Sequence, residues 1–175
     1  VWSPYHTGGW YQDIMFGVGF KCKSISYAPS CSMDSLTEEQ AGYLRRHLDG
    51  MTAISTRERK FKDLLQPLTH KEISVVVDPT ILAGRNVFEK IAAPIGRTCP
   101  YVLVYEIKQH DNVYRIATDL AKQLNADVVE LTNGMLGYHR KTMKEGASPE
   151  EFLGYFKNAL CVVTTSFHGT VFSVL

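Results

Sequence analysis

The stretch whose residue types are best suited to chemistry is SFHGT, residues 166–170, in which a histidine stands between small and hydroxylated residues. A histidine changes charge near neutral pH, so His168 could pair with an anion or pass a proton to a substrate. Gly169 would let a ligand approach the backbone. The hydroxyls of Ser166 and Thr170 would add hydrogen-bond donors. These four residues therefore form a candidate site for an anionic substrate.

The flanking residues indicate where this candidate site would lie. The apolar run CVVTT, residues 161–165, reads as a strand, and the residues after Gly169 read as a helix with Thr170 in its first turn. In open parallel sheets, ligands bind beyond the carboxyl ends of the strands. The start of the following helix presents unpaired N–H groups that suit phosphate or carboxylate. The same residues could instead only cap a core helix, and the sequence leaves both readings open.

A second charged pair, Arg57 and Glu58, follows the short apolar run TAIST, residues 52–56. A planar guanidinium at this point suits a carboxylate or phosphate, which it can bind through two N–H groups. Glu58 could act as a base or could simply favour the start of a helix. Arg57 could equally form only an ion pair with Glu58 or be a solvated charge. Asp78, before Pro79, is expected only to cap a turn.

Composition narrows the class of protein. The 175 residues carry 19 basic and 18 acidic side chains, a formal net charge of +1, without a basic or acidic block. This balance gives no support to nucleic-acid binding. No apolar stretch approaches the roughly 20 residues of a membrane span. With 45% hydrophobic residues, the chain can bury a sizeable core, so we expect a globular protein.

The cysteines argue against a metal centre. Cys22, Cys31, Cys99 and Cys161 are widely spaced and form no CxxC pair, so a zinc site is not expected. A disulfide framework would be unusual in a chain of this size and composition. We therefore expect a reduced, cytoplasmic protein without a metal.

Strands and helices alternate along the first half of the chain. KSISYAPS, TAIST and EISVVVDP read as strands. A helix is expected between the first two, where Thr37 and Gln40 form a capping box and Gly50 closes the helix. A second helix is expected in RERKFKDLLQPL, with its apolar residues turned inward.

The second half repeats this alternation after a stretch of glycines and prolines. YVLVYEI, ADVVEL and CVVTT read as buried strands. Helices are expected from Asp111, as cap, and from Ser148, where Pro149 and Glu151 complete a capping box. We therefore expect α/β architecture, with parallel sheets covered on both faces and organised as two doubly wound domains. The domains are placed at 1–83 and 100–175, with a linker at 84–99.

The ends of the sequence suggest a piece of a longer protein. The chain begins with VW rather than methionine, and its last apolar run has no closing glycine or basic last turn. On this reading both domains are incomplete. A natural terminal helix docked on a core is the alternative.

Five segments, in order along the chain, resemble the polysaccharide pyruvyl transferase family. They are VW at the start, YAPS at 27–30, AISTRE at 53–58, VVVDPTILA at 75–83 and SPEEFLGYFKNALCVVTTSFHGT at 148–170. Two positions depart from the family pattern, since Thr165 stands where an acidic residue or asparagine is frequent and Cys31 where an aromatic is usual.

The resemblance implies a fold and an activity. The fold is a GT-B-like pair of Rossmann-like domains, the first on the acceptor side and the second on the donor side. The activity is transfer of the pyruvyl group of phosphoenolpyruvate onto two hydroxyls of one sugar as a cyclic ketal, in bacterial exopolysaccharide or cell-wall glycan synthesis. His168 would then be catalytic, and Arg57, Glu58, Ser166, Gly169 and Thr170 would bind substrate.

The same resemblance sets the expected partners. These are phosphoenolpyruvate, as donor substrate rather than cofactor, and a saccharide or lipid-linked glycan acceptor, with room for peripheral membrane association of the full-length protein. The 175 residues alone are expected to show little transfer activity. Two alternatives remain: a GT-B glycosyltransferase that uses a nucleotide sugar, and a non-catalytic glycan-binding relative.

Overall fold

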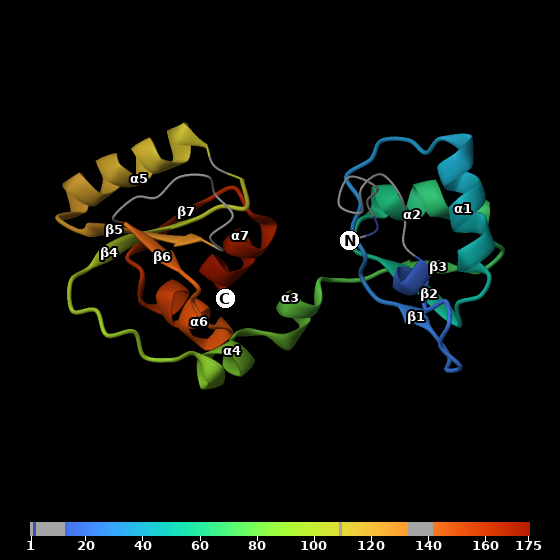
Figure 1. Ribbon diagram of the computed structural model, residues 1–175, viewed down its shortest axis with the longest axis horizontal. Coiled ribbons are helices and arrows are strands. Elements are labelled where there is room, and N and C mark those ends of the chain that lie inside the picture. Colours follow the sequence, from blue (N-terminus) through green and yellow to red (C-terminus); the bar gives the residue numbers. More distant parts are fainter. Residues whose placement is uncertain (1, 3–12, 109, 133–141) are drawn as a thin grey trace. The chain divides into compact units, whose positions relative to one another are not determined.

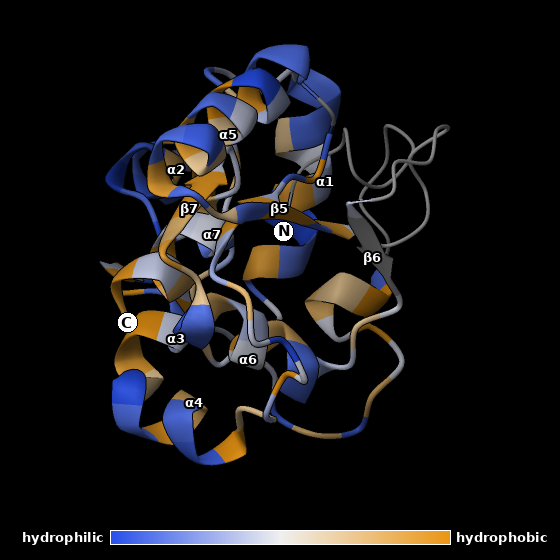
Figure 2. Ribbon diagram, turned by 90° about the vertical axis from the view of Figure 1, so that its left-hand side faces the viewer, coloured by the Kyte–Doolittle hydropathy of each residue, from blue (hydrophilic) through white to orange (hydrophobic). Residues whose placement is uncertain are grey.

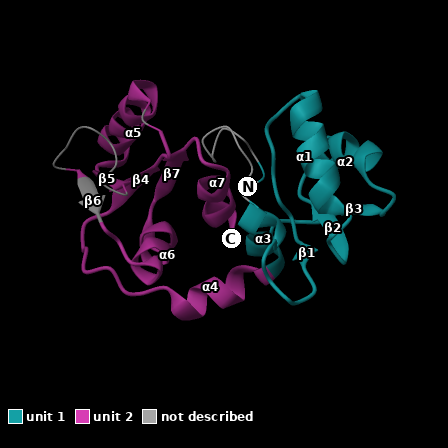
Figure 3. Cartoon of the chain, turned by 45° about the vertical axis from the view of Figure 1, so that its right-hand side comes forward, with its two compact units in different colours: residues 1–82 teal, residues 83–175 magenta. Residues whose placement is uncertain are grey.

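The computed structural model describes residue 2 and residues 13–108, 110–132 and 142–175. Within these residues the chain divides into two compact units, Val1–Leu82 and Ala83–Leu175, coloured separately in Figure 3. Each unit contains its own parallel sheet with helices packed on it (Figure 1). The expected α/β class with parallel strands is therefore confirmed.

Unit 1 is built on a three-stranded sheet in the order β1-β2-β3. Its strands are β1 Ile25–Ser26, β2 Ala53–Thr56 and β3 Ile73–Val75. Its helices are α1 Glu38–Leu48, α2 Arg59–Leu65 and α3 Pro79–Ala83, with 3₁₀ turns at Asp13–Phe16 and Gln66–Leu68. The Thr37–Gln40 capping box predicted from the sequence is formed at the start of α1.

The core of unit 1 lies on one face of this sheet. Leu44 from α1, Phe61 from α2, and Ile54 and Ile73 from the sheet are all buried in one cluster. On the opposite face, Ile25, Ala53 and Ser74 are exposed. Ser55, which lies on the same face as Ala53, is buried, so the described residues of unit 1 cover this second face only in part. The strands of unit 1 are short, at two to four residues each.

Unit 2 is built on a four-stranded parallel sheet in the order β6-β5-β4-β7. Its strands are β4 Tyr101–Tyr105, β5 Asp127–Thr132, β6 Met143–Glu145 and β7 Cys161–Thr164. Its helices are α4 Arg85–Ile91, α5 Asp111–Leu124, α6 Pro149–Asn158 and α7 Phe167–Val174. The capping box at Ser148 and Glu151 is confirmed. The helix expected to be capped by Asp111 begins one residue earlier, with His110 as its N-cap.

Two cores cover the two faces of the unit 2 sheet, as expected for a doubly wound arrangement. Val102 and Val104 of β4 pack with Val113, Ala117 and Ala121 of α5. The alternate residues of the sheet pack on α6, whose aromatic side chains also contact α7. Coloured by hydropathy, α5 shows both hydrophilic and hydrophobic sides (Figure 2). Successive side chains of β4 therefore point to opposite faces of the sheet and pack alternately on α5 and α6.

The segment expected to be a linker at 84–99 is partly helical and belongs to unit 2. Helix α4 packs on α6, and the ring of Phe88 lies 5.2 Å from that of Phe172. The Ala93 N–H donates to the Glu150 carbonyl at 2.9 Å. A Cβ added at Gly154 would lie 2.1 Å from the Ala93 carbonyl oxygen, so a side chain at that position would push the segment away. The sequence favoured a linker here because glycines and prolines punctuate the stretch.

Candidate functional site

Residues of the YAPS and STRE segments come together at the carboxyl edge of the unit 1 sheet. The Arg57 N–H donates to the Pro29 carbonyl at 3.1 Å, which joins the loop after β2 to the loop after β1. Ser55 Oγ accepts from the Ala28 N–H at 3.1 Å. Ala28 has φ of 50°, a left-handed conformation that is costly for a residue with a side chain. Tertiary contacts thus hold the first loop in a strained shape beside the second.

The Arg57 side chain is clamped between two carboxylates. Its Nε donates to Glu58 Oε1 at 2.7 Å and its Nη1 donates to Asp78 Oδ2 at 2.9 Å. Only 17% of the Arg57 side chain is exposed. Burial alone would lower the pKa of Arg57, but the hydrogen bonds to both carboxylates raise it overall. The guanidinium is therefore a permanent cation with a fixed orientation, and the ion pair with Glu58 considered above is formed.

Glu58 has one satisfied and one unsatisfied carboxylate oxygen. Its Oε1 accepts from Arg57 and from Ser30 Oγ, the latter at 2.8 Å. Its Oε2 is buried and has no hydrogen-bond partner within the described part of the chain. A buried carboxylate oxygen without a donor carries a desolvation cost.

Asp78 connects β3 to this group. Its Oδ2 accepts from Arg57, and its Oδ1 accepts from the Thr80 N–H at 2.9 Å at the start of α3. The turn-capping role expected from the sequence is therefore present together with the ion pair. Residues after all three strands of unit 1 converge, because parallel strands end at the same edge.

In unit 2, the end of β7 is fastened to the end of β4. Thr164 Oγ1 donates to the Tyr105 carbonyl at 2.5 Å and accepts from the Ser166 N–H at 3.0 Å. Ser166 then caps α7, since its Oγ accepts from the Gly169 N–H at 3.3 Å. Thr170 Oγ1 donates back to the Ser166 carbonyl at 3.2 Å. The two hydroxyls therefore take part in the start of the helix.

His168 occupies the first turn of α7 rather than the loop before it, where the sequence had placed it. Its neighbours Ser166 and Gly169 are buried, whereas His168 itself is exposed. The ring of Phe167 stands edge-on to the imidazole, with centroids 5.1 Å apart. The imidazole is thus presented at the carboxyl end of β7, above a buried turn.

The strand order of unit 2 reverses next to His168. From β4 the chain proceeds to β5 and then β6 on one side, and returns to β7 on the other side of β4 (Figure 1). The carboxyl ends of β4 and β7 are therefore a topological switch point, the place where open parallel sheets bind ligands. His168 lies on the β7 side of that point.

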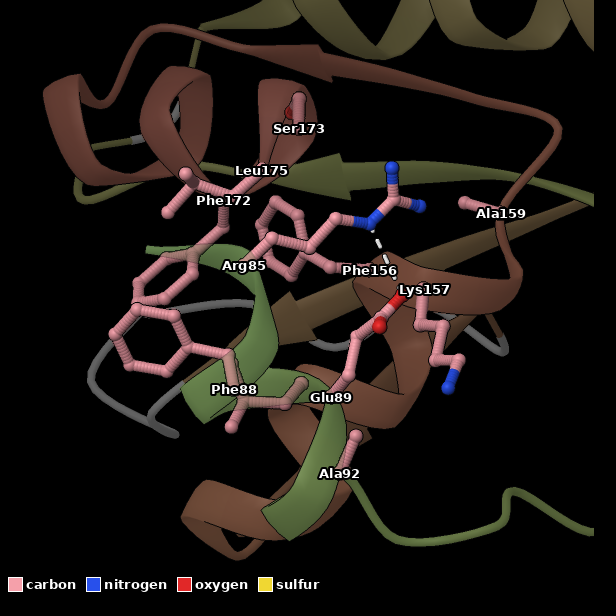
Figure 4. A pocket seen from close by; sticks show the side chains of 11 residues that line it. Arg85, Phe88, Glu89, Ala92, Phe156, Lys157, Ala159, Phe172, Ser173 and Leu175 are labelled. Carbon is pink, nitrogen blue, oxygen red and sulfur yellow. Dashed lines mark hydrogen bonds and ion pairs between the residues drawn. The ribbon is translucent and has the colours of Figure 1, made fainter. Parts of the chain in front are cut away.

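A separate hollow of about 210 Å³ lies elsewhere in unit 2, between α4, α6 and α7. Figure 4 shows Phe88 and Phe172 side by side on one side of it and the Arg85–Glu89 ion pair on another. None of the site residues predicted from the sequence lines it. The hollow borders the aromatic core and does not bring together groups for the expected chemistry.

Two residues at the switch point were not proposed from the sequence. Glu106 follows β4 directly, and its Oε1 lies 2.9 Å from His110 Nδ1. His110 is the N-cap residue of α5. A carboxylate directly after the buried run YVLVY was the available signal, because that position also falls at a carboxyl strand end.

The described residues contain no cluster of three or more His, Cys, Asp or Glu side chains that could hold a metal ion. None of the helices in this part of the chain is long and apolar enough to cross a membrane.

The fold and its strand-end groups define an α/β protein with parallel sheets and a histidine at a switch point. A model of the polysaccharide pyruvyl transferase family matches residues 2–175. The chain therefore belongs to this family, as the resemblance of its five segments implied. Among curated proteins no significant match was found. The same holds for solved structures.

Proposed function

We propose that this protein transfers the pyruvyl group of phosphoenolpyruvate onto a sugar diol as a cyclic ketal. The observation that carries the proposal is the exposed His168 at the switch point of unit 2, in a chain that belongs to the pyruvyl transferase family. The donor carries a phosphate and a carboxylate, and both suit a helix start and an adjacent imidazole. The acceptor would be a saccharide or lipid-linked glycan in exopolysaccharide or cell-wall synthesis.

The reaction needs proton transfer in two directions. The methylene carbon of phosphoenolpyruvate gains a proton, and the neighbouring carbon is attacked by one hydroxyl and then by the second as phosphate leaves. The two hydroxyls lose two protons in all. One makes up for the proton added to the methylene carbon, and the other leaves with the phosphate. His168 can donate the proton or hold the donor anion. Both reactants are substrates, so the proposal requires no cofactor or metal.

Arg57 and Glu58 are proposed as substrate-binding residues of unit 1. The fixed cation suits an anion of the donor, and the partly exposed Glu58 carboxylate suits a sugar hydroxyl. This assignment goes with a GT-B arrangement, in which the carboxyl edges of two Rossmann-like domains meet across a cleft. We also propose a cytoplasmic location, where phosphoenolpyruvate is made, with peripheral membrane association if the acceptor is lipid-linked.

His168→Gln tests the proposal directly. In the full-length protein we expect ketal formation to fall about 10²- to 10⁴-fold, the usual contribution of an acid–base group, with an unchanged melting temperature. Ketal product is measured by mass spectrometry, and folding by circular dichroism. A lower melting temperature with unchanged turnover per folded molecule would show that His168 only supports the helix.

The donor is tested by thermal shift. Phosphoenolpyruvate is expected to raise the melting temperature of the full-length protein, whereas nucleotide sugars are not. The opposite pattern would favour a glycosyltransferase, and no response to either would favour a non-catalytic glycan-binding protein.

Arg57→Lys tests the guanidinium. The substitution keeps the charge but loses the planar group that contacts Glu58 and Asp78 together, so the KM for phosphoenolpyruvate should rise. Arg57→Ala is less informative, because it would leave Asp78, whose side chain is 5% exposed, without this partner and so destabilise the fold. Unchanged kinetics in Arg57→Lys would limit Arg57 to a structural role.

A further inference from the structure

The switch point of unit 2 carries a second imidazole, which is held by a buried carboxylate. Only 6% of the Glu106 side chain is exposed, while 53% of the His110 side chain is exposed. Glu106 Oε1 and His110 Nδ1 are 2.9 Å apart. An ionised carboxylate can only accept, so the hydrogen of this bond is assigned to Nδ1. The carboxylate thereby orients the ring and leaves Nε2 on its far side.

Helix capping does not account for this arrangement. His110 is the N-cap residue of α5, but its side chain makes no capping hydrogen bond. Asparagine, aspartate, serine and threonine are the residues that usually cap a helix. The ring instead turns back to the carboxylate at the end of the preceding strand. The geometry is that of an imidazole base with an orienting carboxylate, as found in many catalytic groups.

Glu106 and His110 form a carboxylate–imidazole dyad, and the register of the sheet places this dyad next to the β7 side of the site. Tyr105 of β4 pairs with Thr164 of β7, so Glu106 and Thr165 are the next residues of two neighbouring strands. Strands in a sheet lie about 4.8 Å apart. His110 precedes the helix that follows β4, and His168 lies in the first turn of the helix that follows β7. The two histidines therefore border one switch point from its two sides.

We propose that His110 is the general base of the ketal transfer and that Glu106 is its positioning residue. This inference rests on the proposed function. In the first addition, His110 Nε2 takes the proton of the attacking hydroxyl as the hydroxyl oxygen bonds to the central carbon of phosphoenolpyruvate. A separate acid adds a proton to the methylene carbon. In the second addition the carbon–oxygen bond to phosphate breaks, the second hydroxyl returns a proton to that acid, and the proton on His110 leaves with the phosphate.

This assignment explains why two titratable groups are needed at one edge. The reaction takes a proton from oxygen and gives one to carbon, so a single histidine would have to be protonated and unprotonated at the same step. Two imidazoles, one on each side of the switch point, separate these tasks.

The test compares three variants of the full-length protein. His110→Ala removes the base, Glu106→Gln replaces the orienting carboxylate, and His70→Ala is the matched control, because His70 is an exposed histidine of unit 1. Steady-state ketal formation gives kcat, and a separate titration with phosphoenolpyruvate gives its dissociation constant. Circular dichroism confirms folding, and activity is repeated with added imidazole.

We expect His110→Ala to lower kcat about 10²- to 10⁴-fold with an unchanged dissociation constant, and free imidazole to restore part of the rate. Glu106→Gln should also lower kcat, because a glutamine NH₂ facing Nδ1 favours the hydrogen on Nε2. Nitrogen NMR of His110 should show that change of tautomer. The control should match the parent.

The other results would overturn the inference. If the parent protein forms ketal and His110→Ala stays within about threefold of it, His110 is not the base and the proposed function still stands. A loss in His110→Ala that imidazole does not restore would assign the dyad to fold stability or donor binding. A parent protein that neither binds nor consumes phosphoenolpyruvate would contradict the proposed function itself and the dyad's role with it.

Discussion

At the residue scale, the close approach of α7 to β7 leaves no room for a side chain at Gly169. A Cβ on Gly169 would lie 2.3 Å from Thr164 Oγ1, 3.0 Å from Thr164 Cβ and 3.1 Å from Thr164 Cγ2, which is closer than van der Waals contact allows. Thr164 cannot turn away without giving up its bond to the Tyr105 carbonyl. The glycine of SFHGT therefore serves close packing of the turn that presents His168.

Gly169→Ala should displace that turn. We expect a loss of about 1–3 kcal/mol in the free energy of unfolding, as for other overpacked positions, and weaker binding of phosphoenolpyruvate. The control is Gly42→Ala in α1, where an added Cβ meets nothing within 4 Å and alanine should be neutral or stabilising. Chemical denaturation measures both. Equal effects of the two substitutions would contradict the packing argument.

At the element scale, strand β4 is anchored by Tyr101. Its hydroxyl donates to the Tyr155 carbonyl of α6 at 2.7 Å, and the two rings lie edge to face at 6.1 Å. Burial, followed by the nearby Tyr155, raises the pKa of Tyr101 to about 12, while Arg97 opposes the shift. The bond thus ties the central strand of unit 2 to the helix that covers it.

This pKa shift makes a prediction about alkaline stability. The folded protein keeps Tyr101 neutral up to about pH 12, whereas the unfolded chain ionises it near pH 10. The stability contributed by Tyr101 is therefore complete below pH 10 and is lost as the pH rises towards 12. Tyr101→Phe should show a smaller loss over that range in urea unfolding curves. If the free energy of unfolding falls equally with pH in the two proteins, the pKa of Tyr101 is not raised in the folded state.

The start of helix α6 is stabilised by neighbouring residues of its own sequence, which form a capping box. Ser148 Oγ accepts from the Glu151 N–H, and the Glu151 carboxylate accepts from the Ser148 N–H. Ser148→Ala should lower the free energy of unfolding by about 1 kcal/mol, as for other N-caps. Ser32→Ala, at an exposed position outside any helix or strand, is the control and should change stability by less than about 0.5 kcal/mol.

At the scale of the whole molecule, the chain has two units with separate cores. Phe61 is fully buried in unit 1, and Leu103 is fully buried in unit 2. Neither core cluster contains residues of the other unit. Each unit should therefore respond to mutation largely by itself.

Phe61→Ala and Leu103→Ala form a reciprocal test. Each should destabilise its own unit by about 2–5 kcal/mol. In hydrogen exchange, Phe61→Ala should lower protection of amides in unit 1 and leave those of β4 and β7 unchanged, and Leu103→Ala should do the reverse. A uniform loss of protection across both units in either variant would show that they unfold as one.

Features that depend on neighbours three or four residues apart could be predicted from the sequence. The capping boxes at Thr37 and Ser148 and the inward-facing Phe61 of α2 were predicted from local spacing, and the structure confirms them. Alternation of apolar strands with helices was sufficient for the α/β class, because parallel strands need crossover connections, which are usually helices. The matched segments also pointed to the family, which the match over residues 2–175 confirms.

Which strand ends meet depends on contacts between residues far apart in the chain. Arg57 and Asp78 are 21 residues apart, and Thr164 and Tyr105 are 59 residues apart. The strand order that makes β4 and β7 a switch point, and so gives Glu106 and His110 a place beside the SFHGT turn, has no local signature. Pairing of distant strands depends on how whole faces pack, and the spacing of residues along one segment does not contain that information.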